Sequence, residues 1–187
     1  MNVQQLFLGL ALASAAGLRA FLPLLVLGLM ARFAHFPLNE HFAWLAGTPA
    51  LVILSVATIV EILGDKFPVV DHALDTMQTF VRPVAGALMV AGTQSESFDP
   101  TTLAVLSIVL GSPLAAGIHV IKGGARLVST ATTAGLANPV ISIAEDIFAL
   151  TLSLLAIFVP IAGAVLALVC MAAAYKALRN RRKLSTV

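Results

Sequence analysis

The sequence has little charge. Only 11% of its 187 residues are Asp, Glu, Lys or Arg, whereas 59% are hydrophobic and the mean hydropathy is +1.00. Soluble domains carry about 25% charged residues, so this composition excludes a soluble core with a polar coat. The sequence therefore predicts an integral membrane protein.

Cysteine is nearly absent, and the basic residues are unevenly distributed. The single cysteine, Cys170, lies in an apolar run, which excludes a disulfide framework and a thiolate metal site. Five of the eleven basic residues lie near the C-terminus: Lys176, Arg179, Arg181, Arg182 and Lys183. Because the rest of the chain is slightly acidic, no basic face for nucleic acid is expected.

Apolar runs predict about six transmembrane segments, within a range of roughly five to seven. The runs cover 5–31, 49–64, 83–93, 101–121, 139–158 and 160–178, and Gly111 and Pro113 are expected to break the fourth. A crossing of about 30 Å takes about 20 helical residues, so 49–64 and 83–93 suffice only with polar residues from between them. Pro160 is either a turn between the last two spans or a kink.

The predicted fold class is therefore an all-α integral membrane protein. We expect a single transmembrane helical domain over 1–178 and a basic cytoplasmic tail over 179–187. The excess of Lys and Arg on the cytoplasmic side of membrane proteins orients that tail, and six spans place the N-terminus in the cytoplasm too. The loop with Glu96 and Asp99 then lies outside.

Two polar segments interrupted by Pro or Gly, 65–82 and 122–138, follow apolar runs. "DTMQTFVRPVAGAL" and "TATTAGLANPVISI" both place threonines before an x-Pro-Val. A second echo has identical spacing, Gly17-x-Arg19 with Gly28-Leu29 against Gly124-x-Arg126 with Gly135-Leu136. These echoes indicate either an internal duplication, which would point to a central site as in transporter folds, or a chance recurrence of small residues.

Three stretches resemble a known family. They are "GLRAFLPLLVLGL", "EILGDKFPVVDHALDTMQTFVRPVAGAL" and "GARLVSTATTAGLANPVISIAEDI". Together they resemble a bacterial family of small polytopic membrane proteins, domain of unknown function number 4126, over roughly 7–160. The resemblance implies a membrane location and no established activity.

The predicted spans and polar segments contain six acids and five bases. The acids are Glu61, Asp65, Asp71, Asp75, Glu145 and Asp146, and the bases are Arg19, Lys66, Arg82, Lys122 and Arg126. A charge at membrane depth costs about 2.5 to 3.5 kcal/mol, so these side chains are expected to face one another or a wet cavity. The near-neutral sum favours an ion-paired core with room for one proton or monovalent cation over a multivalent-metal cage.

Twelve residues are the predicted substrate- or ion-binding set, with no catalytic residue among them. They are Arg19, Glu61, Asp65, Lys66, Asp71, Asp75, Arg82, Arg126, Thr133, Asn138, Glu145 and Asp146. The stripe of Asp71 and Asp75 is either part of a site or a solvated face, and Arg19 is either a structural salt bridge or a substrate contact. Thr133 and its neighbours bind substrate or helix carbonyls, and His119 is expected to be a hydrogen-bonded packing residue.

Three function classes fit these observations. The first is a small-solute or ion transporter or channel of the bacterial inner membrane, with no cofactor. The second is an assembly or lipid-organising protein without turnover. The third is a Mg-dependent enzyme acting on a lipid phosphate or diphosphate, because Asp71-x3-Asp75 is similar to Mg-diphosphate motifs, although no second Asp-rich motif follows. The expected partners are the lipid bilayer and a small solute or ion, with a homo-oligomer left open and nucleic acid not expected.

Overall fold

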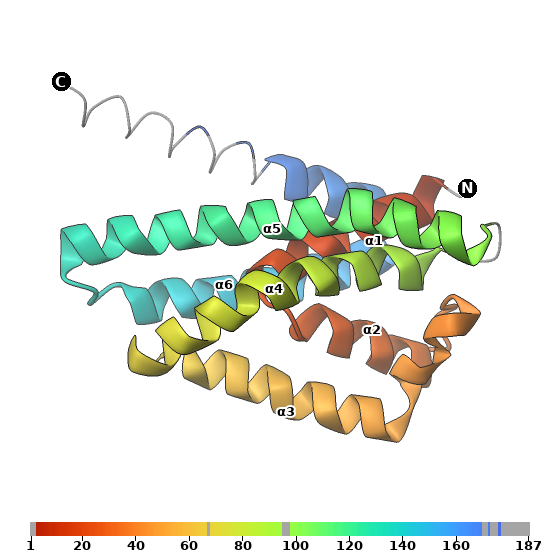
Figure 1. Cartoon of the computed structure of the whole chain (residues 1–187), viewed down its shortest axis with the longest axis horizontal. Helices are drawn as coiled ribbons and strands as arrows, with labels where there is room; N and C mark the ends of the chain where they lie inside the picture. Colours follow the sequence, from red (N-terminus) through yellow and green to blue (C-terminus); the bar gives the residue numbers. More distant parts are fainter. Residues whose placement is uncertain (1–2, 67, 95–97, 170–171, 173–175, 177–187) are drawn as a thin grey trace.

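The computed structural model describes residues 3–66, 68–94, 98–169, 172 and 176, with the backbone alone at 68–73 and 75. All regular elements in these ranges are helices, eight in number (Figure 1). They are α1 (Val3–Leu18), α2 (Leu22–Phe33), the 3-10 helix η1 (Glu40–Ala46), α3 (Thr48–Gly64), α4 (Pro68–Thr93), α5 (Pro100–Thr133), α6 (Asn138–Phe158) and the unlabelled helix Pro160–Val169. The predicted all-α fold is confirmed.

The predicted first span, 5–31, is wrong as one continuous helix, because the chain reverses between α1 and α2 (Figure 1). Gly9 of α1 packs against Thr93 at the end of α4. After α2, the amide of Asn39 donates to the carbonyl of Gly92 at 3.0 Å, so the chain has returned to the same end of the bundle. α1 and α2 therefore form a hairpin whose tip lies inside the bundle.

The apolar core lies between this hairpin and α4. Leu12 of α1, Leu27 of α2 and Met89 of α4 are all fully buried in one cluster of hydrophobic side chains. The buried charged side chains of the described residues lie elsewhere, around the tip of the hairpin.

α4 contains most of the polar stretch 65–82. The apolar run 83–93 is too short to cross a bilayer by itself, so this extension was expected. Pro68 opens this 26-residue helix, and Pro83 lies inside it. The carbonyl of Pro83 accepts a hydrogen bond from Oγ of Ser112 in α5 at 2.9 Å. The expectation that the run 83–93 extends into the polar residues before it is therefore confirmed.

α5 runs unbroken for 34 residues through Pro113, so the predicted interruption of the fourth span is wrong. Gly111 lies so close to Gly86 of α4 that a Cβ added to either residue would collide with the backbone of the other. Close packing of two helices, and not a chain break, therefore explains the glycine at this position. The predicted polar segment 122–138 forms the last three turns of the same helix and the connection after it.

Asp99 begins α5 as its N-cap. Its carboxylate accepts hydrogen bonds from Oγ1 of Thr102 at 2.5 Å and from the amide of Thr102 at 3.0 Å. These hydrogen bonds favour the charged form and lower the pKa of the Asp99 carboxyl below its ordinary value.

Two tight turns complete the chain. The α5–α6 connection places Ala134 and Gly135 in the left-handed region, with φ of 51° and 84°. At the end of α6, Gly163 packs directly against Ala156, so the chain folds back on itself. Pro160 therefore follows a turn between two helices and is not a kink in one.

The two echoing segments take different conformations. Pro83 lies inside α4, whereas Pro139 lies in the first turn of α6. Likewise, Arg19 follows the last residue of α1, whereas Arg126 lies inside α5. The echoes therefore do not correspond to a pair of matching elements.

The lengths and composition of the described helices indicate a membrane location. α5 and α6 are each long and apolar enough to cross a bilayer, and η1 with α3, bent by 65°, is a third candidate. Large apolar side chains cover the outside of these helices, with Ile53, Val109 and Ile147 each at least 60% exposed. Such surfaces are typical of contact with hydrocarbon.

Candidate functional site: a buried charge cluster

Eight charged side chains from five parts of the fold meet at the tip of the α1–α2 hairpin. We call them the charge cluster: Arg19, Glu61, Asp65, Arg82, Lys122, Arg126, Glu145 and Asp146. The cluster has four acids and four bases, so its formal charges balance. Apart from contacts within one helix, the contacts of the cluster join residues at least 19 positions apart in the sequence.

Asp65 is the central anion. It directly follows α3 and is 7% exposed. Its Oδ2 accepts hydrogen bonds from three cations: Arg19, Lys122 at 3.1 Å and Arg126 at 2.7 Å. One carboxylate oxygen therefore links the hairpin tip to two turns of α5.

Arg19 lies fully buried in the break between α1 and α2. Besides Asp65, it contacts Oδ1 of Asp146 at 2.5 Å and donates to Oγ of Ser142 at 2.9 Å. Both of these partners lie in α6. Arg19 thus ties the hairpin tip to the first turns of α6, which fits the interpretation of this arginine as a salt-bridge residue.

Glu145 connects α6 to α5. Its Oε2 lies 3.2 Å from Nζ of Lys122 and 2.9 Å from Nη2 of Arg126. The side chain of Glu145 is 10% exposed and that of Asp146 is 18% exposed, against 2% or less for Asp65 and Glu61. The two acids of α6 are therefore the most accessible anions of the cluster.

Arg82 organises a second group of contacts from α4. Its guanidinium donates to the carbonyl of Gly17 at 3.0 Å, to Oε1 of Gln78 and to Nδ1 of His119 at 2.7 Å, and it lies 3.7 Å from Glu61. Since a guanidinium can only donate, Nδ1 of His119 is the acceptor, and this assigns the imidazole proton to Nε2. His119 is thereby a neutral, hydrogen-bonded residue.

Charged side chains bind the backbone groups that the helix break exposes. Glu61 accepts hydrogen bonds from the amides of Ala20 at 2.9 Å and Phe21 at 3.2 Å, at the start of α2. At the end of α1, Lys122 donates to the carbonyl of Leu18 at 3.3 Å, and Arg82 donates to the carbonyl one residue earlier. An anion thus meets a helix N-terminus and cations meet a helix C-terminus, as the helix dipole favours.

Seven of the twelve predicted site residues lie in this cluster: Arg19, Glu61, Asp65, Arg82, Arg126, Glu145 and Asp146. Three others make hydrogen bonds outside it, although Lys66 also lies near enough to Asp146 to interact with it electrostatically. Thr133 donates to the carbonyl of Ser129 at 2.7 Å, Asn138 donates to Oγ1 of Thr130 at 3.0 Å, and Lys66 donates to the carbonyl of Ile62 at 3.5 Å. The interpretation of Thr133 as a partner of a helix carbonyl therefore fits the structure better than a place in the site.

The side chains of Asp71 and Asp75 lie outside the described residues, as does that of His72. Among the described residues, no group of three or more His, Cys, Asp or Glu side chains is placed to hold a metal ion.

Four further residues of the site were not predicted to belong to it: Gln78, His119, Lys122 and Ser142. Lys122 was counted among the charges but not assigned to the site, although it lies one turn before Arg126 on the buried face of α5. Gln78 likewise lies one turn before Arg82. Polar residues at i and i+4 from a charged residue of the site were thus the pattern that could have identified these two.

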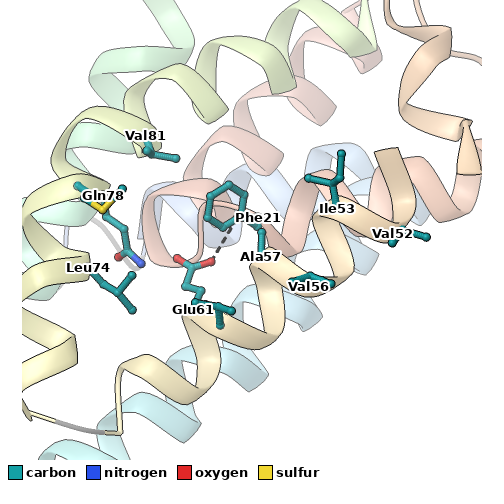
Figure 2. Close-up of a pocket in the computed structure, with 11 residues that line it drawn as sticks. Phe21, Val52, Ile53, Val56, Ala57, Glu61, Leu74, Gln78 and Val81 are labelled. Carbon is teal, nitrogen blue, oxygen red and sulfur yellow. Dashed lines mark hydrogen bonds between the residues drawn. The ribbon is translucent and has the colours of Figure 1, made fainter. Parts of the chain in front are cut away.

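Two apolar cavities border the cluster. The α3–α4 cavity, of about 430 Å³, has Glu61 and Gln78 among largely apolar lining residues (Figure 2). The α5–α6 cavity, of about 460 Å³, has Lys122 and Glu145 in its wall together with apolar residues of α1, α5 and α6. Each cavity therefore has a largely apolar wall and at least one charged residue of the cluster.

Fold and site together define an α-helical protein with two to three candidate membrane spans and an ion-paired polar centre. Residues 6–180 match the family described as "Domain of unknown function (DUF4126)", and the chain belongs to this family. The family resemblance found in the sequence is thereby confirmed. No curated protein and no solved structure matches the chain.

Proposed function

We propose that the protein is a transporter or channel for a small solute or ion in the bacterial inner membrane, with the charge cluster as its binding site. The observation that carries this proposal is the helix break at Arg19–Phe21, whose backbone groups are bound by charged residues of three other helices. Within a bilayer, non-helical backbone is tolerated only where it is buried in protein or lines a water-filled cavity. Broken helices of this kind mark the substrate and ion sites of many transporters.

Glu145 is the residue that we assign to proton or monovalent-cation exchange. It is one of the two most exposed acids of the cluster, and it lines the α5–α6 cavity. Protonation of Glu145 would remove its ion pairs with Lys122 and Arg126 and would change the cluster from four acids against four bases to three against four. The uncompensated positive charge then favours rearrangement of the hairpin tip or entry of an anion.

The hairpin also sets the topology that we propose. Because α1 and α2 enter and leave at the same end of the bundle, they contribute no net crossing. The other five α-helices of the described residues are α3 to α6 and Pro160–Val169, the last being the described part of the predicted span 160–178. With one crossing assigned to each, the two termini lie on opposite sides. With the basic tail in the cytoplasm, the N-terminus lies outside, together with the loop between α4 and α5. This proposal replaces the sequence-based expectation of a cytoplasmic N-terminus, which counted 5–31 as one span.

Ion flux into liposomes tests the proposal. Purified protein is reconstituted into phosphatidylethanolamine and phosphatidylglycerol vesicles, and gradients of H⁺, Na⁺ or K⁺ are imposed, each followed by a dye that responds to that ion. We expect the protein to dissipate at least one gradient and Glu145→Gln to abolish that flux. Glu40→Gln, which changes an exposed acid of η1, is the matched control and should leave the flux unchanged. Fluxes equal to those of protein-free vesicles for every ion would refute transport of these ions.

A lipid-organising role is the second candidate, because both cavities are lined mainly by apolar side chains. Vesicles that show lipid redistribution or protein clustering without solute flux would favour it. The phosphotransferase alternative predicts something else, namely saturable Mg²⁺ or Mn²⁺ binding by isothermal titration that Asp75→Asn removes.

A further inference from the structure

The α3–α4 cavity has the form of a ligand site and is separate from the proposed ion path through Glu145. Its volume of about 430 Å³ lies within the roughly 300–1,000 Å³ of small-molecule pockets. Its walls are mainly apolar and include Val52, Val56, Val60, Leu74, Met77 and Val81. Two polar side chains, Glu61 and Gln78, face each other across one end (Figure 2).

The side-chain amide of Gln78 has a hydrogen-bonded oxygen and, within the described residues, an unpaired nitrogen. Oε1 accepts a hydrogen bond from Arg82, which fixes the orientation of the amide and turns Nε2 toward Glu61 (Figure 2). Gln78 is only 3% exposed, and within the described residues its Nε2 has no hydrogen-bond partner. A buried donor without a partner is costly, so this nitrogen favours a ligand that supplies an acceptor.

Glu61 determines which acceptor fits. Its two oxygens each accept one backbone hydrogen bond, from Ala20 and Phe21, and a carboxylate oxygen can accept a second. A hydroxyl placed between the two side chains accepts from Gln78 and donates to Glu61. A ketone could only accept, and a carboxylate would add a second negative charge beside Glu61.

The position of Gln78 in α4 disfavours a charged headgroup. It lies ten residues after Pro68 and fifteen before Thr93, which is about 15 Å and 22 Å at roughly 1.5 Å per residue. Val52, Val56 and Met77 on the cavity rim are more than half exposed, on a surface that the proposed topology places in hydrocarbon. A ligand can therefore enter from the bilayer, but a charge at this depth is strongly disfavoured.

We propose that the α3–α4 cavity binds a neutral lipid alcohol, with its hydroxyl between Glu61 and Gln78 and its apolar body along α3 toward Val52. This site goes beyond the proposed transport function. It shares Glu61 with the charge cluster, and its access from the bilayer rests on the proposed topology, but it requires no transport.

Photo-crosslinking in nanodiscs tests the assignment. The probe is 1-dodecanol carrying a diazirine in its tail, and adducts are located by mass spectrometry. We expect adducts on α3 and α4, and competition in the order 1-dodecanol, 2-dodecanone, dodecane, with dodecanoate no better than dodecane. The alcohol should compete about tenfold better than the alkane, which is the effect of one to two net hydrogen bonds.

Two variants separate the site from general lipid contact. Gln78→Glu keeps an acceptor for Arg82 but removes the Nε2 donor, so labelling should fall to the level of the alkane. Ala57→Phe fills the cavity and should abolish labelling, whereas Ala104→Phe, on an exposed face of α5, should not. Equal competition by dodecane and dodecanol, preference for the ketone or carboxylate, or labelling that survives Ala57→Phe would each overturn the proposal.

Discussion

Replacing Asp65 by asparagine tests whether the charge cluster holds the fold together. The substitution keeps the side-chain size but leaves Arg19, Lys122 and Arg126 facing a neutral amide. Removing one partner from a buried ion pair costs about 3–5 kcal/mol, because the remaining charge is left desolvated and uncompensated. For a chain of this length, we expect the midpoint of thermal unfolding to fall by roughly 6–20 °C.

A second substitution restores the balance of charge. Lys122→Met removes a cation while keeping an unbranched apolar side chain, so Asp65→Asn/Lys122→Met has three acids against three bases. If the two charges interact as their 3.1 Å separation indicates, the double variant should be more stable than the sum of the single effects by about 2 kcal/mol.

Circular dichroism measures all four proteins of this cycle, with heat in dodecyl maltoside for the thermal midpoint and with added SDS for the free energy of unfolding. Glu40→Gln serves as the control, and because the side chain of Glu40 is 86% exposed we expect a change within about 0.5 kcal/mol. The reasoning is refuted if Asp65→Asn is no more destabilising than this control, or if the effects of the two cluster substitutions simply add.

Three further predictions follow from the fold. Gly111→Ala should destabilise by about 1–3 kcal/mol in the same unfolding assay, because the new Cβ meets the backbone of Gly86, whereas Gly117→Ala in the same helix has open space around its Cβ and should be neutral or stabilising. Glu61→Ala should cost about 3–5 kcal/mol and speed hydrogen exchange at the amides of Ala20 and Phe21, and slow exchange retained there would contradict the capping role. In a Cys170→Ala background, cysteines at Val3 and Thr101 should react with an impermeant thiol reagent from the same side of the membrane and one at Ala134 from the other, whereas a single span over 5–31 would put the first two on opposite sides.

Local sequence patterns predicted those helices whose bounds depend on residues close by in the sequence. The apolar run 83–93 was too short to span a bilayer alone, which predicted that its helix includes polar residues before it, and α4 does so from Pro68. The same reasoning was wrong at Pro113, because a proline weakens a helix but packing against a neighbour can hold it together. Here Gly111 brings α5 against the backbone of α4 just before the proline.

The hairpin break could not be predicted locally. Residues 5–31 are apolar enough to continue as one helix, and the neighbouring Gly17 and Pro23 are common in transmembrane helices. What stabilises the break is Glu61, which lies 40 and 41 residues further along the chain from the amides that it binds. No window centred on Arg19 contains that information.

That the charged residues meet in the interior could be predicted from composition and not from local patterns. Charges at membrane depth must be paired, so the near-equal counts of acids and bases predicted that they meet, without saying which pairs form. The pairs depend on topology, which is why Lys122 was missed although it contacts both Asp65 and Glu145. Composition thus determined that a cluster exists, and tertiary structure determined its members.

Stability alone is a weak explanation for retaining eight charges in such an interior. Well-packed apolar residues of similar volume are often as stabilising as a buried ion pair, or more so. The helix break, however, leaves amides and carbonyls that apolar side chains cannot bind, and Glu61, Arg82 and Lys122 bind four of them. A continuous helix would need none of these partners. The cluster is therefore required only because the helix is broken, and the break in turn requires a functional reason. Exchange of a proton or ion at Glu145, next to that backbone, is the use that we propose, and it is the reason for choosing Glu145→Gln as the decisive variant in the flux assay.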